Sequence, residues 1–328
     1  MPTSSRRAVR TAALASTVVL AAGLSVAALG APASAQQVPE RSSSCFDPHS
    51  VGAGRGAARG VDHREMSARD VRVIEARTRR ILERKDAAAR AAAVASKASI
   101  PVYVHEMRAA DGAGDVSPTQ IQVQINVLNQ TYSSSDVNEP AGSTAPDTGV
   151  HFVLAGTDEF FNNAWHQDKQ SSTYRSRTRQ GGKNALNIWL VDFKPLGIAT
   201  FPSDYAKSPG IDGLRVQYNS LRRTSRPAPG YQAIPHFDLG ETATHEAGHW
   251  LGLLHTFEGG CTSSNDGVAD TPAQSSPTAG CPAGRNSCSL PGLDPIHNYM
   301  DYSFDSCYYE FSPGQVSRMN EMWTAYRA

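Results

Sequence analysis

Three histidines and one glutamate in the last third of the chain have the types and spacing of a metal site. His245 and His249 are four residues apart, so on a helix both imidazoles project from one face and can bind one ion. Gly252 can take the left-handed conformation that ends such a helix and turns His255 toward the same ion. Three neutral imidazoles with a fourth position left for water are the donor set of a catalytic zinc site. Glu246 would lie beside that water as a general base.

A helix over residues 239–251 must hold these side chains in place. Ala243, Ala247 and Leu251 recur at helical spacing, so we expect their face to pack on a sheet while the histidines face a cleft. An H-E-x-x-H pattern alone also occurs by chance on ordinary buried helices. The added G-x-x-H makes the metal site the better interpretation.

Strand patterns before the motif predict the sheet. Residues 100–105 have strand composition, and Ser117, Pro118 and Gln120 have the order of a helix cap, a first-turn proline and a third-position glutamine. Further strand patterns occupy residues 150–155, 185–193, 197–201 and 213–218. Together they predict an α/β fold, a mixed twisted sheet with two helices above the zinc cleft.

The chain after residue 259 is rich in Gly, Ser, Pro and Asn, and too poor in apolar residues to be held by a core alone. Disulfides would supply the missing constraint, each contributing about 2–4 kcal/mol. The four cysteines here can pair in three ways: they are Cys261, Cys281, Cys288 and Cys307. A helix over residues 312–326 follows, with Ser312 as its cap and Pro313 in its first turn. We therefore expect a loop-rich, disulfide-bonded subdomain that ends in a helix.

Hard oxygen ligands gather in the loop after the motif. Asp266, Asp270 and Thr271 could together bind calcium, as such loops do in many exported proteins. Aspartates also cap turns, and the spacing alone does not separate these two interpretations.

Residues 1–35 are typical of an export signal. Arg6, Arg7 and Arg10 precede an apolar and small-residue run, and the sequence A-S-A at 33–35 is a cleavage site. The paired arginines allow twin-arginine export, although general secretion fits better. No later stretch approaches the roughly 18 consecutive apolar residues of a transmembrane helix. We therefore expect a secreted, extracellular protein that does not bind membranes.

Residues 36–97 differ in composition from the rest. Residues 1–97 hold 16 basic against 8 acidic residues, whereas residues 98–328 hold 15 against 23. Residues 61–96 lack Gly and Pro and carry a thin apolar stripe at helical spacing, so we expect one or two helices that dock on the body or come off. These features predict a basic, helical pro-segment over 36–97 ahead of a main domain over 98–328, and need no nucleic acid to explain them.

Cys45 is the odd cysteine of an exported chain. A thiolate is a strong zinc ligand, so Cys45 could occupy the fourth position on the metal until the front segment is cut away. The alternatives are an intermolecular disulfide and an idle thiol.

The extended motif, followed by a downstream Met turn at 298–302, is the pattern of the metzincin metallopeptidases. Within them, the sequences H-T-F-E-G-G-C at 255–261, D-T-P at 270–272 and N-Y-M-D-Y at 298–302 resemble the pappalysin family, in particular its cytophagalysin and ulilysin-like members. The similarity covers about residues 100–328. It includes Q-I-Q-V-Q-I-N-V-L-N at 120–129 and G-I-A-T-F-P at 197–202.

The resemblance implies a role for each site residue. It implies zinc on His245, His249 and His255. It makes Glu246 the base and proton shuttle, Met300 a hydrophobic floor under the metal, and Tyr302 a donor to the oxyanion or a displaceable fifth ligand. A tyrosine at that position could also be a packed aromatic.

The resemblance also implies the support of the site. It implies disulfides Cys261–Cys288 and Cys281–Cys307, a calcium ion in the loop after the motif, and subdomains that meet at about residue 252. The edge strand at 197–201 would pair with an extended peptide, which implies an endopeptidase acting on proteins or peptides. We expect this enzyme to be a monomer made as a latent precursor.

Two other interpretations compete with this one. The serralysin branch of the metzincins would carry Gly/Asp nonapeptide repeats after the motif, and the sequence has none. Branches with aspartate as third ligand are excluded by His255. A catalytically inactive zinc-binding or adhesion module on the same scaffold would have no need of Glu246.

Overall fold

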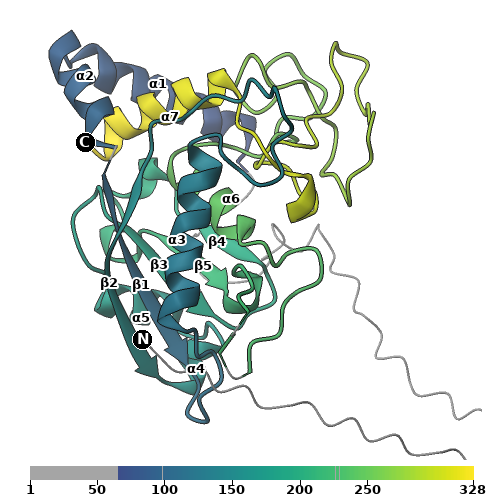
Figure 1. The fold of residues 1–328 in the computed structure, drawn as a ribbon. Coiled ribbons are helices and arrows are strands. Elements are labelled where there is room, and N and C mark those ends of the chain that lie inside the picture. The colour runs from purple at the N-terminus through teal and green to yellow at the C-terminus, as the bar shows by residue number, and fades with distance from the viewer. Residues whose placement is uncertain (1–65, 98, 226, 229) are drawn as a thin grey trace, which may run out of the picture. The chain divides into compact units, whose positions relative to one another are not determined.

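A computed structural model describes residues 66–97, 99–225, 227–228 and 230–328 (Figure 1). They lie within one compact unit of the chain, Phe46–Ala328. The expected export signal, Cys45 and the front half of the expected pro-segment lie outside the described residues.

A five-stranded mixed sheet forms the centre of the described unit, as the strand patterns predict. Its strands are β1 (Ile100–Arg108), β2 (Phe152–Phe161), β3 (Leu186–Val191), β4 (Gly197–Ala199) and β5 (Leu214–Gln217). The order in space is β2-β1-β3-β5-β4. All neighbours pair in parallel except β4, which runs antiparallel to β5. The short strand β4 is therefore an edge of the sheet.

Two helices cover one face of this sheet, α3 (Pro118–Tyr132) and α6 (Glu241–Trp250) (Figure 1). Ser117 caps α3 as its sequence predicts, since its hydroxyl accepts the N–H of Gln120 at 3.2 Å. Ala243 and Ala247 of α6 are fully buried in the main hydrophobic core together with strand residues such as Leu214. The zinc-motif helix thus packs its apolar face on the sheet.

Two further helices, α4 (Asn163–His166) and α5 (Ser171–Thr178), were not expected from the sequence. Tyr174 of α5 packs with Met107 and Trp189 in a second, smaller core. The residues of α5 are mostly polar and show no helical apolar period, which is why pattern analysis misses it.

The C-terminal helix α7 (Pro313–Tyr326) lies alongside α1 (Ala68–Glu83) and α2 (Ala87–Ser96) (Figure 1). The start of α7 is a capping box, in which the Ser312 hydroxyl accepts the N–H of Gln315 and the Gln315 side chain accepts the N–H of Ser312. Short 3-10 helices connect other parts of the chain: Pro202–Asp204, Pro209–Ile211, Tyr218–Ser220 and Asp305–Cys307. None of the helices in the described part of the chain is long and apolar enough to cross a membrane.

Two disulfides hold the loops between α6 and α7. They join Cys261 to Cys288 and Cys281 to Cys307, which is the pairing that the resemblance implies. The loop-rich C-terminal part of the chain is therefore cross-linked as expected.

Candidate active site

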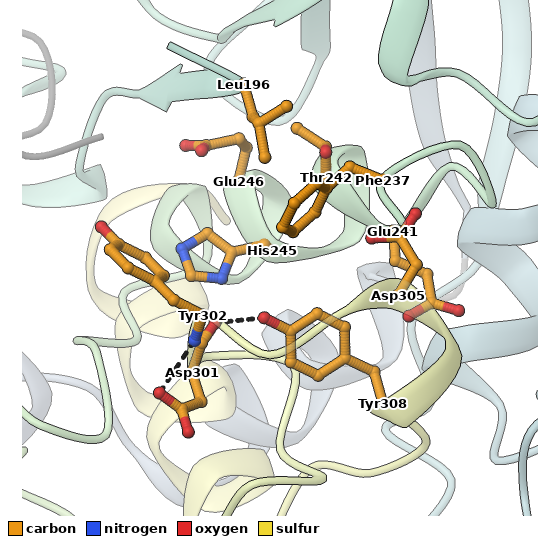
Figure 2. A pocket seen from close by; sticks show the side chains of 10 residues that line it. All are labelled: Leu196, Phe237, Glu241, Thr242, His245, Glu246, Asp301, Tyr302, Asp305 and Tyr308. Carbon is orange, nitrogen blue, oxygen red and sulfur yellow. Dashed lines mark hydrogen bonds between the residues drawn. The ribbon is translucent and has the colours of Figure 1, made fainter. Parts of the chain in front are cut away.

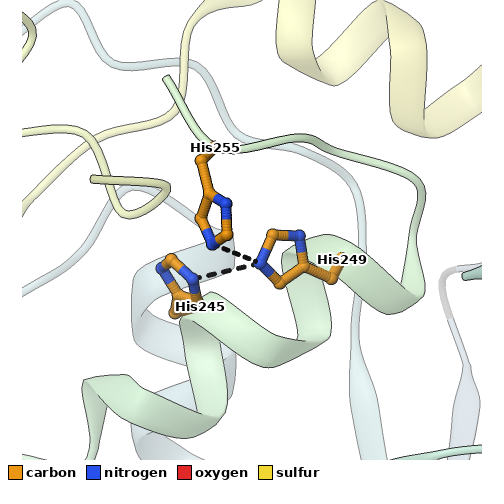
Figure 3. A group of neighbouring side chains, drawn as sticks. All are labelled: His245, His249 and His255. Carbon is orange, nitrogen blue, oxygen red and sulfur yellow. Dashed lines mark hydrogen bonds between the residues drawn. The ribbon is translucent and has the colours of Figure 1, made fainter. Parts of the chain in front are cut away.

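Three imidazoles converge on one point beside α6 (Figure 3). The Nε2 atom of His249 lies 3.1 Å from the Nε2 atoms of both His245 and His255. All three side chains are buried. Two come from successive turns of α6, and the third comes from the loop after it, as the motif predicts.

Backbone carbonyls fix the orientation of two of these rings. The Nδ1 atom of His245 donates to the carbonyl oxygen of Tyr299 at 2.6 Å, and that of His249 donates to the carbonyl oxygen of Leu253 at 2.9 Å. A carbonyl can only accept, so both Nδ1 atoms carry the proton and both Nε2 atoms present a lone pair. Such hydrogen bonds on the far nitrogen orient histidine ligands and raise their basicity.

The donor set fits a zinc ion. Burial lowers the pKa of both His245 and His255 to about 3, so these rings are neutral, the form that binds metal. Lone pairs held close to one another repel unless a cation lies between them. Three nitrogen donors at these separations suit tetrahedral zinc and leave one position for another ligand.

The turn after α6 depends on Gly252. Its φ is +101°, a left-handed conformation that a residue with a Cβ rarely adopts. A Cβ at this position would also lie 2.5 Å from Cγ of Met322 on α7. The glycine therefore lets the chain reverse tightly and brings His255 to the other two histidines.

The start of α6 differs slightly from the prediction. The helix begins at Glu241, two residues later than expected, because Gly240 has a φ of +91° and cannot continue it. The carboxylate of Asp305 accepts the N–H of Leu239 at 2.9 Å, which anchors this end of the zinc helix to the opposite loop.

The segment around Met300 packs against the helix that carries His245 and His249. The sulfur of Met300 approaches the backbone of Gly248, where a Cβ would be only 2.4 Å away. Two residues after Met300, Tyr302 points its hydroxyl toward the three histidines, 2.9 Å from Nε2 of His255. One turn therefore orients His245 through the Tyr299 carbonyl, supports the zinc helix and adds a hydroxyl group at the metal position.

The carboxyl group of Glu246 lines the same pocket as His245 (Figure 2). Its Oε2 atom is buried and has no hydrogen-bond partner among the described residues. Edge strand β4 comes so close that a Cβ on Gly197 would lie 2.5 Å from Oε1. Burial raises the pKa of Glu246 to about 8, and a zinc ion nearby would lower it again because a positive charge favours the carboxylate.

The pocket extends from Glu246 and His245 toward a second acidic group (Figure 2). Its walls are Leu196, Phe237, Thr242, Asp301, Tyr302 and Tyr308, and its far end holds Glu241 and Asp305. Glu241 is 2% exposed, and its Oε2 atom has no hydrogen-bond partner among the described residues.

Several acidic groups surround Glu241. Burial, followed by the charges of Asp305 and Asp136, raises its pKa to about 11, while Arg222 acts in the opposite direction. The Oε1 atom accepts a hydrogen bond from Asn138 at 3.2 Å. The sequence analysis missed this cluster, because its members Asp136, Glu241 and Asp305 are far apart in the chain. The only local signal was an acidic residue one turn before the first histidine.

The loop expected to bind calcium divides into two parts. Thr271 donates its hydroxyl to Oδ1 of Asp266 at 2.7 Å, close to the carbonyl oxygen of Val268 at 2.8 Å. The Oδ2 atom of Asp266 is buried without a partner among the described residues. Asp270 instead accepts hydrogen bonds from the Ser312 hydroxyl and the Gly314 N–H, so it caps α7. Asp266 and Thr271 thus lie together, whereas Asp270 points elsewhere.

The sequence of this chain is similar to those of known extracellular proteases. A peptidase family model described as pregnancy-associated plasma protein-A matches residues 193–324. An extracellular metalloprotease of Pyricularia oryzae is 42% identical over 72% of this chain and 79% of its own length. One of Verticillium alfalfae is also 42% identical, over 82% of this chain and 90% of its own.

Solved structures of mirolysin have the same fold. Mature mirolysin of Tannerella forsythia, in complex with a cleaved peptide, is 30% identical with a TM-score of 0.58, over 67% of this chain and 89% of its own. A promirolysin mutant from the same organism is 30% identical with a TM-score of 0.59, over 68% and 79% of the two chains. With the histidine cage, these similarities show that the chain belongs to the pappalysin family of metalloendopeptidases.

Proposed function

We propose that this metalloendopeptidase hydrolyses peptide bonds with Glu246 as its general base. The observation that carries the proposal is the buried Glu246 carboxyl group, which lines the same pocket as His245 and has a side-chain oxygen without a partner among the described residues. A zinc ion on the three histidines would supply a Lewis acid that polarises the scissile carbonyl and acidifies water. Glu246 takes the proton of the attacking water and delivers it to the departing amine.

Two neighbours of Glu246 complete this arrangement. The Tyr302 hydroxyl lies on the metal side of the pocket and donates to the oxyanion that develops on the scissile carbonyl. Edge strand β4, whose Gly197 touches Glu246, pairs antiparallel with an extended substrate through main-chain hydrogen bonds. Both roles place the scissile bond against Glu246.

The acidic end of the pocket favours a basic residue directly after the scissile bond. An arginine or lysine side chain there would reach the Oε2 atom of Glu241, and a cation would satisfy a buried carboxyl group that otherwise stays protonated. Asp305 also lines this end, but its carboxylate is engaged by the start of α6. Glu241 is therefore the main determinant of selectivity.

Cleavage-site profiling tests this function. The processed enzyme, digesting a denatured proteome, should cut on the N-terminal side of arginine and lysine. Glu241→Gln should reduce the preference for basic residues at least about 10-fold, the worth of one charge-assisted hydrogen bond. Glu139→Gln is the matched control, because Glu139 lies near the cluster but does not line the pocket. A wild-type enzyme that prefers apolar residues at this position would contradict the proposal.

Export, latency and calcium complete the proposal. The signal-like start of the sequence supports a secreted protein, and the basic front segment supports a latent precursor of a monomeric enzyme. Part of residues 36–97 is removed on activation. Before activation, Cys45 binds the zinc ion and blocks its fourth position. Asp266 and Thr271, with the Val268 carbonyl, supply oxygens for one calcium ion. A Cys45→Ala precursor that stays as inactive as the unmodified precursor would contradict the role of Cys45.

A further inference from the structure

Residues 66–97 reach the zinc motif through three intermediate side chains, those of Arg318, Met322 and Glu258. We infer that these residues stay in the active enzyme and position the third zinc ligand, His255. The activating cleavage would then fall before Met66. This inference rests on the proposed function only in assuming that a front segment is removed. It moves the end of that segment from about Lys97 to a point before the first described helix.

The first contact runs from α1 to the turn that ends α6. Oε1 of Glu75 accepts a hydrogen bond from Nη1 of Arg318 at 2.6 Å, and Nε of Arg318 donates to the carbonyl oxygen of Gly252 at 2.7 Å. Arg318 is 8% exposed, so these two hydrogen bonds offset the cost of burying its guanidinium group. Gly252 is the left-handed residue that turns the chain toward His255. Glu75 therefore acts on the zinc site through one arginine and one carbonyl group.

The second contact is a packing contact on the same glycine. Met322 of α7 lies against Gly252, and the buried hydroxyl of Thr78 on α1 lies 3.7 Å from the Met322 sulfur. The same hydroxyl is 2.9 Å from the hydroxyl of Tyr326. Helix α1 thus packs on Met322, the side chain that lies against Gly252 in the turn after α6.

The third contact lies behind His255. The backbone N–H of Met66 donates to Oε1 of Glu258. Oε2 of the same carboxylate is 3.4 Å from the backbone nitrogen of His255 and 3.6 Å from its Nδ1 atom. The beginning of the segment therefore contacts the carboxylate next to the third zinc ligand.

The end of the segment is also built into the domain. Ser96 accepts a hydrogen bond from Nε1 of Trp323 at 3.0 Å, and Lys85 donates to the carbonyl oxygen of Thr324 at 2.7 Å. Lys97 is 2% exposed, and its ammonium group donates to the Thr148 carbonyl oxygen. A cut near Lys97 that released α1 and α2 would remove all of these partners and expose buried side chains of α7.

The N-terminus of the active enzyme gives the first test. Intact mass and N-terminal sequencing of the secreted, active protein should place the first residue before Met66. An active enzyme that begins near Ile100, without α1 and α2, would overturn the inference. This measurement does not depend on which peptide bonds the enzyme cleaves, so it can fail while the proposed function stands.

The rate of zinc release gives the second test. In the active enzyme, Glu75→Ala should raise the rate at which a chelator takes up zinc by about 10-fold, the lower end of the effect of removing a residue that orients a ligand. Glu83→Ala is the matched control, because it removes the same side chain from an exposed position of α1. KM should not change, because α1 does not line the pocket, and Glu75→Asp should restore part of the zinc retention. Equal release rates for Glu75→Ala and Glu83→Ala would overturn the positioning role.

Discussion

Replacing Glu241 by glutamine should make the protein more stable at neutral and alkaline pH. Burial raises the pKa of Glu241 from its ordinary value of 4.5 to about 11. The folded protein therefore holds a proton that the unfolded chain releases above pH 4.5. The stability that this group contributes is complete below its unfolded pKa and falls as the pH rises toward its folded pKa. Glu241→Gln removes this loss, because an amide does not titrate.

The change in the free energy of unfolding per pH unit sets how much Glu241→Gln stabilises the protein. One group that is protonated in the folded state and ionised in the unfolded state costs about 1.4 kcal/mol per pH unit. Between pH 6 and pH 8, the stability of the variant relative to the wild type should therefore grow by up to about 3 kcal/mol. The negative charge of Asp136 also acts on Glu241, so the two carboxyl groups titrate as a pair and the measured pH dependence will be smaller.

Urea unfolding at several pH values between 6 and 9, with zinc in excess, measures this effect. Every protein should carry Glu246→Ala, so that self-digestion does not distort the curves. The free energies of unfolding of the Glu241→Gln protein and its parent should diverge as the pH rises, whereas Glu139→Gln should follow its parent. Curves that keep a constant separation across the pH range would refute a raised pKa of Glu241.

Three further substitutions test other parts of the site. Tyr302→Phe should lower kcat by about 100-fold, as expected for the loss of one oxyanion donor, with zinc content by mass spectrometry unchanged; a wild-type kcat would make Tyr302 a packing residue. Gly252→Ala should lower the free energy of unfolding in urea by about 2–5 kcal/mol and weaken zinc retention, because the new Cβ strains the backbone and clashes with Met322. A variant as stable as the wild type that retains zinc would contradict this. Arg327→Ala should lower the free energy of unfolding by about 3–5 kcal/mol, since the buried carboxylate of Asp212 loses its bidentate arginine partner. A loss below about 1 kcal/mol would show that the other partners of Asp212 suffice.

Much of the zinc site follows from local sequence. The spacing of His245 and His249 on a helix, and the glycine that must follow before His255, are dictated by helical geometry and by the backbone freedom of one residue. The caps of α3 and α7 are equally local, since Ser117 and Ser312 act on residues three positions ahead. Patterns of this kind can be identified without knowledge of the fold.

The parts that sequence analysis missed depend on long-range contacts. The acidic end of the pocket joins Glu241 at the start of α6 to Asp305, 64 residues later, so no short window of sequence contains it. Asp270 was expected to bind calcium, but its carboxylate faces the start of α7, 42 residues later. The front helices were expected to dock or come off, and their sequence gives no indication that Glu75 reaches Arg318.

The role of Glu246 as general base is tested by comparing wild-type and Glu246→Ala enzyme in hydrolysis of a peptide, with the zinc content of each measured on the same samples. Both proteins should bind one zinc ion, because the three histidines remain, and the variant should lose at least about 100-fold in kcat, the smallest effect expected for a positioned general base. Chelation should abolish the wild-type activity, and added zinc should restore it. A zinc-loaded Glu246→Ala enzyme that cleaves as fast as the wild type would show that Glu246 is not the general base.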